Sequence, residues 1–189
     1  KRECLFMTFT NTMFITKDNF LSKDSIDFIE NQVLSSSFPY YFNAHTIHDP
    51  PDNNAYMGHD ILRRPEERNE GETFNSNYGE QFLKILKEFT DLINYNLTDI
   101  YRISVNITFA GATGNCPIHI DHPYSHHQLL VYLNDCDPVS KTVVLSQDKS
   151  EVEHIISPKK YMGACFSSAP HYMIFPKKGA RAVIVYTFK

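Results

Sequence analysis

One stretch indicates both the fold and the chemistry of the chain: Cys116-Pro117-Ile118-His119-Ile120-Asp121-His122. Isoleucine alternates there with polar residues, which predicts a strand over 116–122. Side chains two positions apart in a strand share one face. His119 and Asp121 should therefore point together toward whatever the strand covers, and His122 should point away from them.

An imidazole and a carboxylate on one face supply two of the three ligands of a facial metal site. Two histidines and one carboxylate, with the remaining positions open, are typical of non-haem Fe(II) oxygenases. The second histidine is expected far along the chain, and the candidate is His171 in the strand-like run 168–175. We therefore identify His119, Asp121 and His171 as candidate metal ligands and catalytic residues, with Arg181 as a candidate cation beside them.

The order of these four residues, with strand-like sequence around each and Gly179-Ala180-Arg181 opening the last strand, resembles the Fe(II)/2-oxoglutarate-dependent dioxygenases. Within that superfamily the chain is most similar to the prolyl-4-hydroxylase-like branch. The run Val131-Tyr132-Leu133-Asn134 supports the similarity, because that branch carries a tyrosine-leucine-asparagine strand after the first metal motif. The resemblance covers about residues 101–188, and more loosely the helices before them.

The resemblance implies that His119, Asp121 and His171 bind Fe(II), with 2-oxoglutarate as cosubstrate and O2 taking the last position on the metal. Arg181 would bind the far carboxylate of 2-oxoglutarate through its planar guanidinium. Tyr132 and Thr142 would add hydroxyl groups to the same site. The implied reaction is oxidative decarboxylation of 2-oxoglutarate to succinate, coupled to hydroxylation of a substrate C–H bond, with a peptidyl prolyl residue as one candidate.

The chain departs from the family pattern at two places. Phe109 stands where related animal prolyl hydroxylases tend to have a tyrosine that holds the cosubstrate, and Asp137-Pro138-Val139-Ser140 replaces a frequent Gly-Gly turn. Neither change removes a metal ligand. Polar residues also alternate with apolar ones over 101–110, so this strand has a polar face that either lines the pocket or faces solvent. These residues are Arg102, Ser104, Asn106 and Thr108.

The expected fold is a mainly β, α+β domain: a double-stranded β-helix (a cupin-like jelly-roll) with two N-terminal bracing helices. A single domain should span 1–189, with 1–100 as support and 101–189 as the jelly-roll core. Apolar spacing predicts one helix after Ser22 and a second over 78–97. Residues 3–16 and 40–42 are candidate strands, and 43–77 is expected to be a long loop, either a lid or a surface excursion. The eight core strands are predicted at about 101–110, 116–122, 127–134, 141–147, 152–157, 161–167, 170–175 and 181–188.

Charge and composition point to neither nucleic acid nor a membrane as a partner. The net charge is −4, with acidic and basic residues mixed, so nucleic acid is not indicated. No apolar run is long enough to cross a bilayer, and the N-terminus lacks the apolar core of a signal peptide, so we expect a soluble cytoplasmic protein without a membrane partner. The four cysteines lack C-x-x-C spacing and are interpreted as buried thiols.

Two other classes of protein fit parts of the pattern. A cupin-like jelly-roll could bind a metal or a ligand without oxidation, although such a module has no need for Arg181. A zinc hydrolase could use the same three ligands, but no general-base glutamate accompanies the motif. His122, His126 and His127 are either a surface histidine cluster or an alternative ligand set. The substrate, a peptide, a protein or a small molecule, is not identified by any motif.

Overall fold

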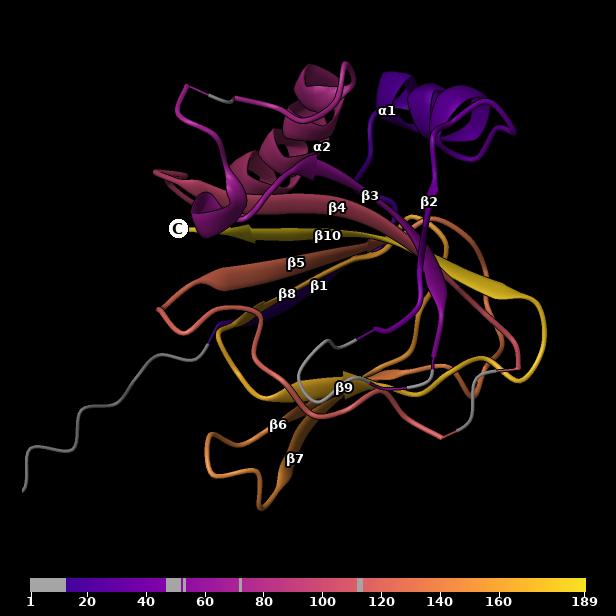
Figure 1. The fold of residues 1–189 in the computed structure, drawn as a ribbon. Helices are drawn as coiled ribbons and strands as arrows, with labels where there is room; N and C mark the ends of the chain where they lie inside the picture. The colour runs from indigo at the N-terminus through magenta and orange to yellow at the C-terminus, as the bar shows by residue number, and fades with distance from the viewer. Residues whose placement is uncertain (1–12, 47–51, 53, 72, 112–113) are drawn as a thin grey trace, which may run out of the picture.

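The computed structural model describes residues 13–46, 52, 54–71, 73–111 and 114–189, and in it two antiparallel sheets face each other (Figure 1). The larger sheet has seven strands in the order β1-β8-β5-β10-β4-β3-β2, and the smaller has three in the order β7-β6-β9. The strand bounds in the larger sheet are Phe14–Lys17 (β1), Gly163–Ser167 (β8), His127–Tyr132 (β5), Ala180–Phe188 (β10), Ile100–Phe109 (β4), Tyr56–Leu62 (β3) and Tyr41–Asn43 (β2). Those in the smaller are Val152–Ile156 (β7), Thr142–Leu145 (β6) and His171–Met173 (β9). The mainly β class is confirmed.

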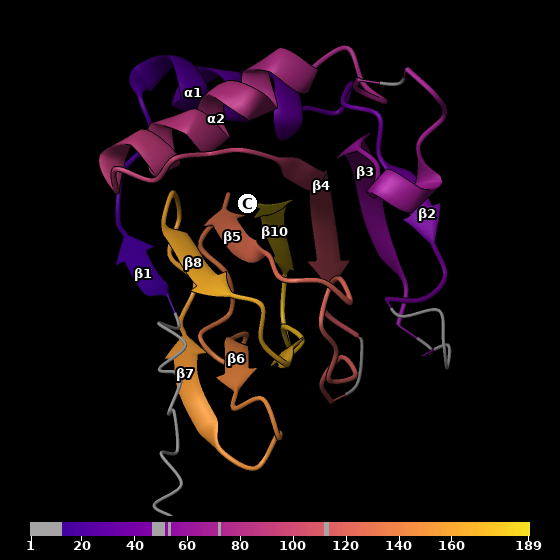
Figure 2. The same cartoon turned by 90° about the vertical axis from the view of Figure 1, so that its left-hand side faces the viewer.

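Helices cover the outer face of the larger sheet (Figure 2). Helix α1 (Lys23–Phe28) is capped by the Ser22 side chain, as predicted, and continues into a π-helix at Ile29–Val33. Helix α2 (Gly79–Leu92) follows three strands and a short 3-10 turn at Pro65–Glu67. The helices therefore do not form the expected N-terminal pair, because the long one lies near the middle of the chain. None of the helices in the described segments is long and apolar enough to span a bilayer.

The core is divided into two layers by the larger sheet. On the helix side, the α2 residues Phe82, Ile85, Leu86 and Phe89 are fully buried against the sheet. On the other side, Leu130, Val144, Phe166 and Val183 fill the space between the two sheets. Each fully buried side chain of this size contributes about 1.5–3 kcal/mol. Strands β5 and β10 are buried on both faces. The side chains that they direct toward the inner layer are therefore held in fixed positions.

The loop predicted at 43–77 is wrong over 56–62, where the chain forms strand β3. This strand pairs with β4 from Tyr56 opposite Thr108 to Leu62 opposite Ile103. A glycine, a histidine and an aspartate interrupt its apolar pattern, so its sequence alone does not predict a strand. Gly58 is required where it stands, because a Cβ there would lie 2.8 Å from the Tyr56 ring.

The predicted strand at 116–122 is also wrong as a regular strand. The segment makes two isolated bridges to the chain around β9, Asn115 with Ile174 and His119 with His171. Pro117 has no N–H to donate, which prevents a continuous ladder. The two bridges still hold the segment against the edge of the smaller sheet, so the two ligands of the His-x-Asp motif are placed without a regular strand.

The remaining predictions differ from the structure mainly at element ends. Helix α2 ends at Leu92 rather than 97, because Asn94 adopts a left-handed backbone conformation with φ 53°. The predicted strand at 3–16 lies mostly outside the described residues, apart from β1. Cys116 and Cys165 are buried thiols as predicted, Cys136 is half-buried, and Cys4 lies outside the described residues.

Candidate metal centre and its cavity

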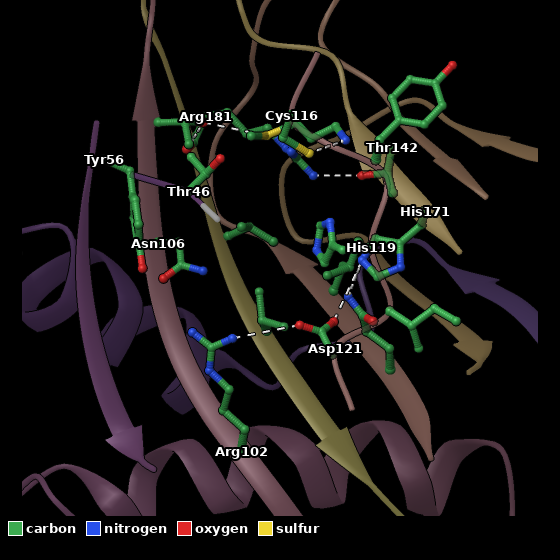
Figure 3. Close-up of a pocket in the computed structure, with 18 of the residues that line it drawn as sticks. Thr46, Tyr56, Arg102, Asn106, Cys116, His119, Asp121, Thr142, His171 and Arg181 are labelled. Atoms are coloured by element: carbon green, nitrogen blue, oxygen red, sulfur yellow. Dashed lines mark hydrogen bonds and ion pairs between the residues drawn. The ribbon is translucent and has the colours of Figure 1, made fainter. Parts of the chain in front are cut away.

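The structure brings His119, Asp121 and His171 together, with one ligand atom from each within 4.8 Å of the others (Figure 3). Two reciprocal backbone hydrogen bonds between His119 and His171, of 3.0 and 2.9 Å, join the segment at 115–121 to β9. The two imidazole centroids lie 4.5 Å apart. Ligands that are 50 residues apart in the chain are thus fixed on one side of the smaller sheet.

Both histidines are held in the tautomer that suits a metal. The Nδ1 of His119 lies 2.9 Å from the carbonyl oxygen of Pro117, and the Nδ1 of His171 lies 2.9 Å from that of Ala169. A carbonyl oxygen only accepts, so each Nδ1 carries the hydrogen and donates it. Each Nε2 is left with a lone pair, as in metal-binding histidines whose other ring nitrogen is hydrogen-bonded.

Asp121 presents one oxygen to the histidines and the other to two arginines. Its buried Oδ2 has no hydrogen-bond partner and lies 3.6 Å from the Nε2 of His171, so two lone-pair atoms face each other. Its Oδ1 lies 3.7 Å from Arg64 and 3.8 Å from Arg102. Burial alone would raise the pKa of Asp121, but His171, His119, Arg102 and Arg64 outweigh it and lower the pKa to about 2. An ionised carboxylate beside two imidazole Nε2 atoms is a donor set for a divalent cation.

Gln128, which the sequence analysis did not single out, contacts the same centre from β5. Its amide nitrogen lies 3.3 Å from the Nε2 of His171, whose lone pair accepts the bond. Burial, followed by His119, lowers the pKa of His171 to about 4, so this ring remains neutral and able to accept. No sequence signal marks Gln128, because a single glutamine after His127 at the start of an apolar strand is not specific to a metal centre.

The metal centre opens into a cavity of about 400 Å³ between the two sheets. Its wall is made by β3, β4, β5, β6, β9 and β10 together with the segment at 115–121. The polar face of β4 lines it through Arg102, Asn106 and Thr108, which decides between the two alternatives left by the sequence. Phe109 is 46% exposed and is not on the wall.

Arg181 lies at the closed end of this cavity, on β10, and is only 4% exposed. One of its terminal nitrogens donates to Thr142 Oγ1 over 2.7 Å, and its Nε is buried without a partner. Tyr132 places its hydroxyl 3.1 Å from the same Thr142 oxygen, yet its side chain does not line the cavity. None of the ion pairs found among the described residues involves Arg181. Burial of an unpaired cation is costly, so Arg181 is a candidate for binding an anion.

Two of the other histidines near the motif, His122 and His126, form a separate buried group, so the surface-cluster alternative is wrong for them. The Nε2 of His122 lies 2.7 Å from the Thr187 hydroxyl, and its ring stacks on Tyr124 with centroids 4.9 Å apart. The His126 ring packs edge-on against the His122 ring, with centroids 5.0 Å apart. Within the described part of the chain, the only group suited to hold a metal is the triad described above. His122 therefore points away from the triad, as expected.

Solved structures of other proteins share this fold. No family model matches the sequence, and no curated protein matches it. A 2OG-Fe(II) oxygenase family protein from Burkholderia pseudomallei aligns over 94% of this chain and 84% of its own, with a TM-score of 0.72 and 16% identity. The chain has the fold of the 2OG-Fe(II) oxygenases. The predicted similarity to the prolyl hydroxylases is confirmed at the level of the fold.

Two prolyl hydroxylases show that second likeness. One is from Trichoplax adhaerens, solved with a peptide fragment of the hypoxia inducible factor oxygen degradation domain, and covers 93% of this chain and 82% of its own at a TM-score of 0.63 and 19% identity. The other is a prolyl-4-hydroxylase from Pseudomonas putida, covering 93% and 92% at a TM-score of 0.58 and 14% identity. At these identities the likeness concerns the oxygenase fold alone.

Proposed function

We propose that this chain is an Fe(II)- and 2-oxoglutarate-dependent oxygenase that hydroxylates a C–H bond of a peptide, protein or small-molecule substrate. The observation that carries the proposal is the pairing, in one cavity, of a facial triad with a buried arginine that has no acidic partner. A metal-binding module of the cupin type needs only the triad, whereas Arg181 adds a fixed site for a carboxylate.

The residues of the triad fit the metal once the Gln128 amide releases the Nε2 of His171, from which it lies 3.3 Å away. The two Nε2 lone pairs and the unpartnered Asp121 Oδ2 are the three donors, and the carboxylate is the ligand that suits a hydroxylating centre. When bound, Fe(II) and 2-oxoglutarate supply the oxidising chemistry, with succinate and carbon dioxide as products. The protein orients these donors through the carbonyls of Pro117 and Ala169 and surrounds them with a largely buried cavity.

The Arg181 end of the cavity fits the far carboxylate of 2-oxoglutarate. The guanidinium is preorganised by Thr142 and lies 5.3 Å from the centre of the Tyr132 ring. Its buried Nε, now without a partner, gives the carboxylate a second donor. Tyr132 acts mainly through Thr142 in this arrangement. Prolyl hydroxylation is the family-level candidate for the reaction, supported by the fold of the peptide-bound hydroxylase from Trichoplax adhaerens.

The proposal is tested by succinate formation from 2-oxoglutarate under air with added Fe(II), since such enzymes often turn over the cosubstrate without their substrate. Succinate should form with the unaltered chain, vanish in His119→Ala, and require much more 2-oxoglutarate in Arg181→Ala. His154→Gln is the matched histidine control, because its ring stacks on Phe14 outside the cavity. No succinate, together with no 2-oxoglutarate binding to the metal-loaded chain, would leave a non-oxidative jelly-roll binding protein.

A further inference from the structure

Two arginines besides Arg181 line the cavity: Arg64, which follows β3, and Arg102, which lies on β4. Arg181 on β10 lies opposite Thr108 of β4, whereas Arg102 lies opposite Thr187, six positions along the ladder. At about 3.3 Å per residue, their Cα atoms are separated by roughly 20 Å along the sheet. Figure 3 shows the two arginines at opposite ends of the view, with the metal ligands between. The backbones of Arg181 and Arg102 are thus far apart, while the Arg102 side chain reaches back to within 3.8 Å of Asp121 Oδ1, beside the metal centre.

Arg64 and Arg102 converge beside the metal centre. Arg64 donates to the backbone carbonyl of Asp121, and both guanidinium groups lie within 4 Å of the Asp121 Oδ1. Their side chains are only 27% and 14% exposed. Arg102 also pairs with Asp60 over 3.4 Å. The Asp60 side chain is 43% exposed, so solvent weakens the compensation it offers.

The charges at this end of the cavity do not balance once the metal and cosubstrate are present. Without them, Asp121 and Asp60 match the two arginines. A divalent metal adds two positive charges, and the chelating carboxylate of 2-oxoglutarate removes one, because the other carboxylate is on Arg181. One positive charge would then remain beside Asp121, where burial makes an unpaired charge costly.

We propose that the substrate presents a single carboxylate that binds to Arg64 and Arg102, next to the C–H bond that is oxidised. This inference rests on the proposed oxygenase function. A carboxylate matches the planar donors of a guanidinium and supplies the one missing charge, whereas a phosphate carries 1.5–2 charges and would overcompensate. Tyr56 and Asn106 supply further polar groups on this wall, and Figure 3 shows the Tyr56 hydroxyl directed toward the Asn106 amide.

The carboxylate has two sources, a free small acid or an acidic side chain within a peptide. The test therefore uses the full chain loaded with Mn(II) and 2-oxoglutarate, titrated with two sets of matched ligands. One set holds N-acetyl amino acids and their carboxamides. The other holds end-blocked Gly-Asp-Gly and Gly-Glu-Gly and their Asn and Gln counterparts. We expect the acids of one set to bind at least about tenfold more tightly than the amides, as for hydrogen bonds to charged groups.

Variants assign that preference to the two arginines. Arg64→Gln and, separately, Arg102→Lys should reduce the acid-to-amide ratio several-fold, while Lys87→Gln, which removes an exposed charge on α2, should not change it. Arg102→Lys retains the positive charge next to Asp60, so this variant should still fold. Thermal melting checks that it does. Equal binding of acids and amides, no binding of any acid at millimolar concentration, or an unchanged ratio in both arginine variants would each overturn the inference. Failure of 2-oxoglutarate itself to bind would instead overturn the proposed function, and this inference with it.

Discussion

Arg181 donates a 2.7 Å hydrogen bond to Thr142 although the two residues lie on strands of different sheets. Arg181 belongs to β10 of the seven-stranded sheet and Thr142 to β6 of the three-stranded sheet. The bond therefore closes one end of the cavity and fixes the guanidinium in place. Both side chains are buried, and none of the ion pairs among the described residues neutralises the arginine.

Thr142→Val should weaken binding of 2-oxoglutarate to the Mn(II)-loaded chain by about fivefold, or about 1 kcal/mol, because it removes one hydrogen bond while keeping the side-chain shape. Tyr132→Phe should have a smaller effect, because the phenol reaches Thr142 rather than the cavity. Isothermal titration calorimetry measures both. A larger loss in Tyr132→Phe than in Thr142→Val would show that the phenol contacts the cosubstrate directly.

Asp121→Asn should lower the stability of the metal-free chain as well as its metal affinity. Loss of the carboxylate leaves Arg64 and Arg102 without their buried partner, at a cost of about 2–3 kcal/mol, reduced because Arg64 is partly exposed. His119→Gln removes a metal ligand without breaking an ion pair, so it should change stability by only about 1 kcal/mol or less. Urea unfolding with chelator present separates the two effects. Equal stability of both variants would show that the arginines do not depend on Asp121.

Glu88→Ala should destabilise the fold without affecting the metal centre. Glu88 on α2 accepts hydrogen bonds from the Ser22 backbone N–H at 3.0 Å and from the Ser25 hydroxyl at 2.8 Å, and so ties α2 to the start of α1. Loss of these charge-assisted bonds should cost about 1–2 kcal/mol, because they are only partly buried. Lys87→Ala on the exposed face of α2 is the control. A Glu88→Ala chain that unfolds at the same urea concentration as the control would contradict this role.

Gly163→Ala should destabilise the core by about 1–3 kcal/mol. A Cβ at this position of β8 would lie 2.8 Å from the rings of both Phe20 and Phe89, which is closer than packed carbon atoms approach. Combining Gly163→Ala with Phe89→Leu should cost less than the sum of the two single changes, because the smaller side chain gives room. Thermal melting of the four chains provides the cycle, and strict additivity would disprove the contact.

Much of the fold followed from local patterns. The apolar stripe of α2 and the β-rich runs of β4, β5 and β10 predict their own elements, because burial of one face imposes a period on the sequence. The ends of the elements followed less closely from these patterns: the left-handed backbone at Asn94 ends α2 earlier than its apolar stripe predicts. Strand β3 was missed because its hydrogen bonds come from β4, some 45 residues later, and its own residues include Gly58 and Asp60.

The sequence by itself determined which residues make up the triad, because a histidine and a carboxylate two residues apart, with a distant His171 and Arg181, form a pattern that few other chemistries need. Only the tertiary structure decided how these residues are held and what surrounds them. The bridge between His119 and His171 replaces the expected strand, since Pro117 cannot donate. Arg64 contacts Asp121, which lies 57 residues later in the chain. The polar face of β4, with Arg102, points into the cavity because β3 and β10 flank this strand. Such pairings depend on distance in space and burial, which no local pattern encodes.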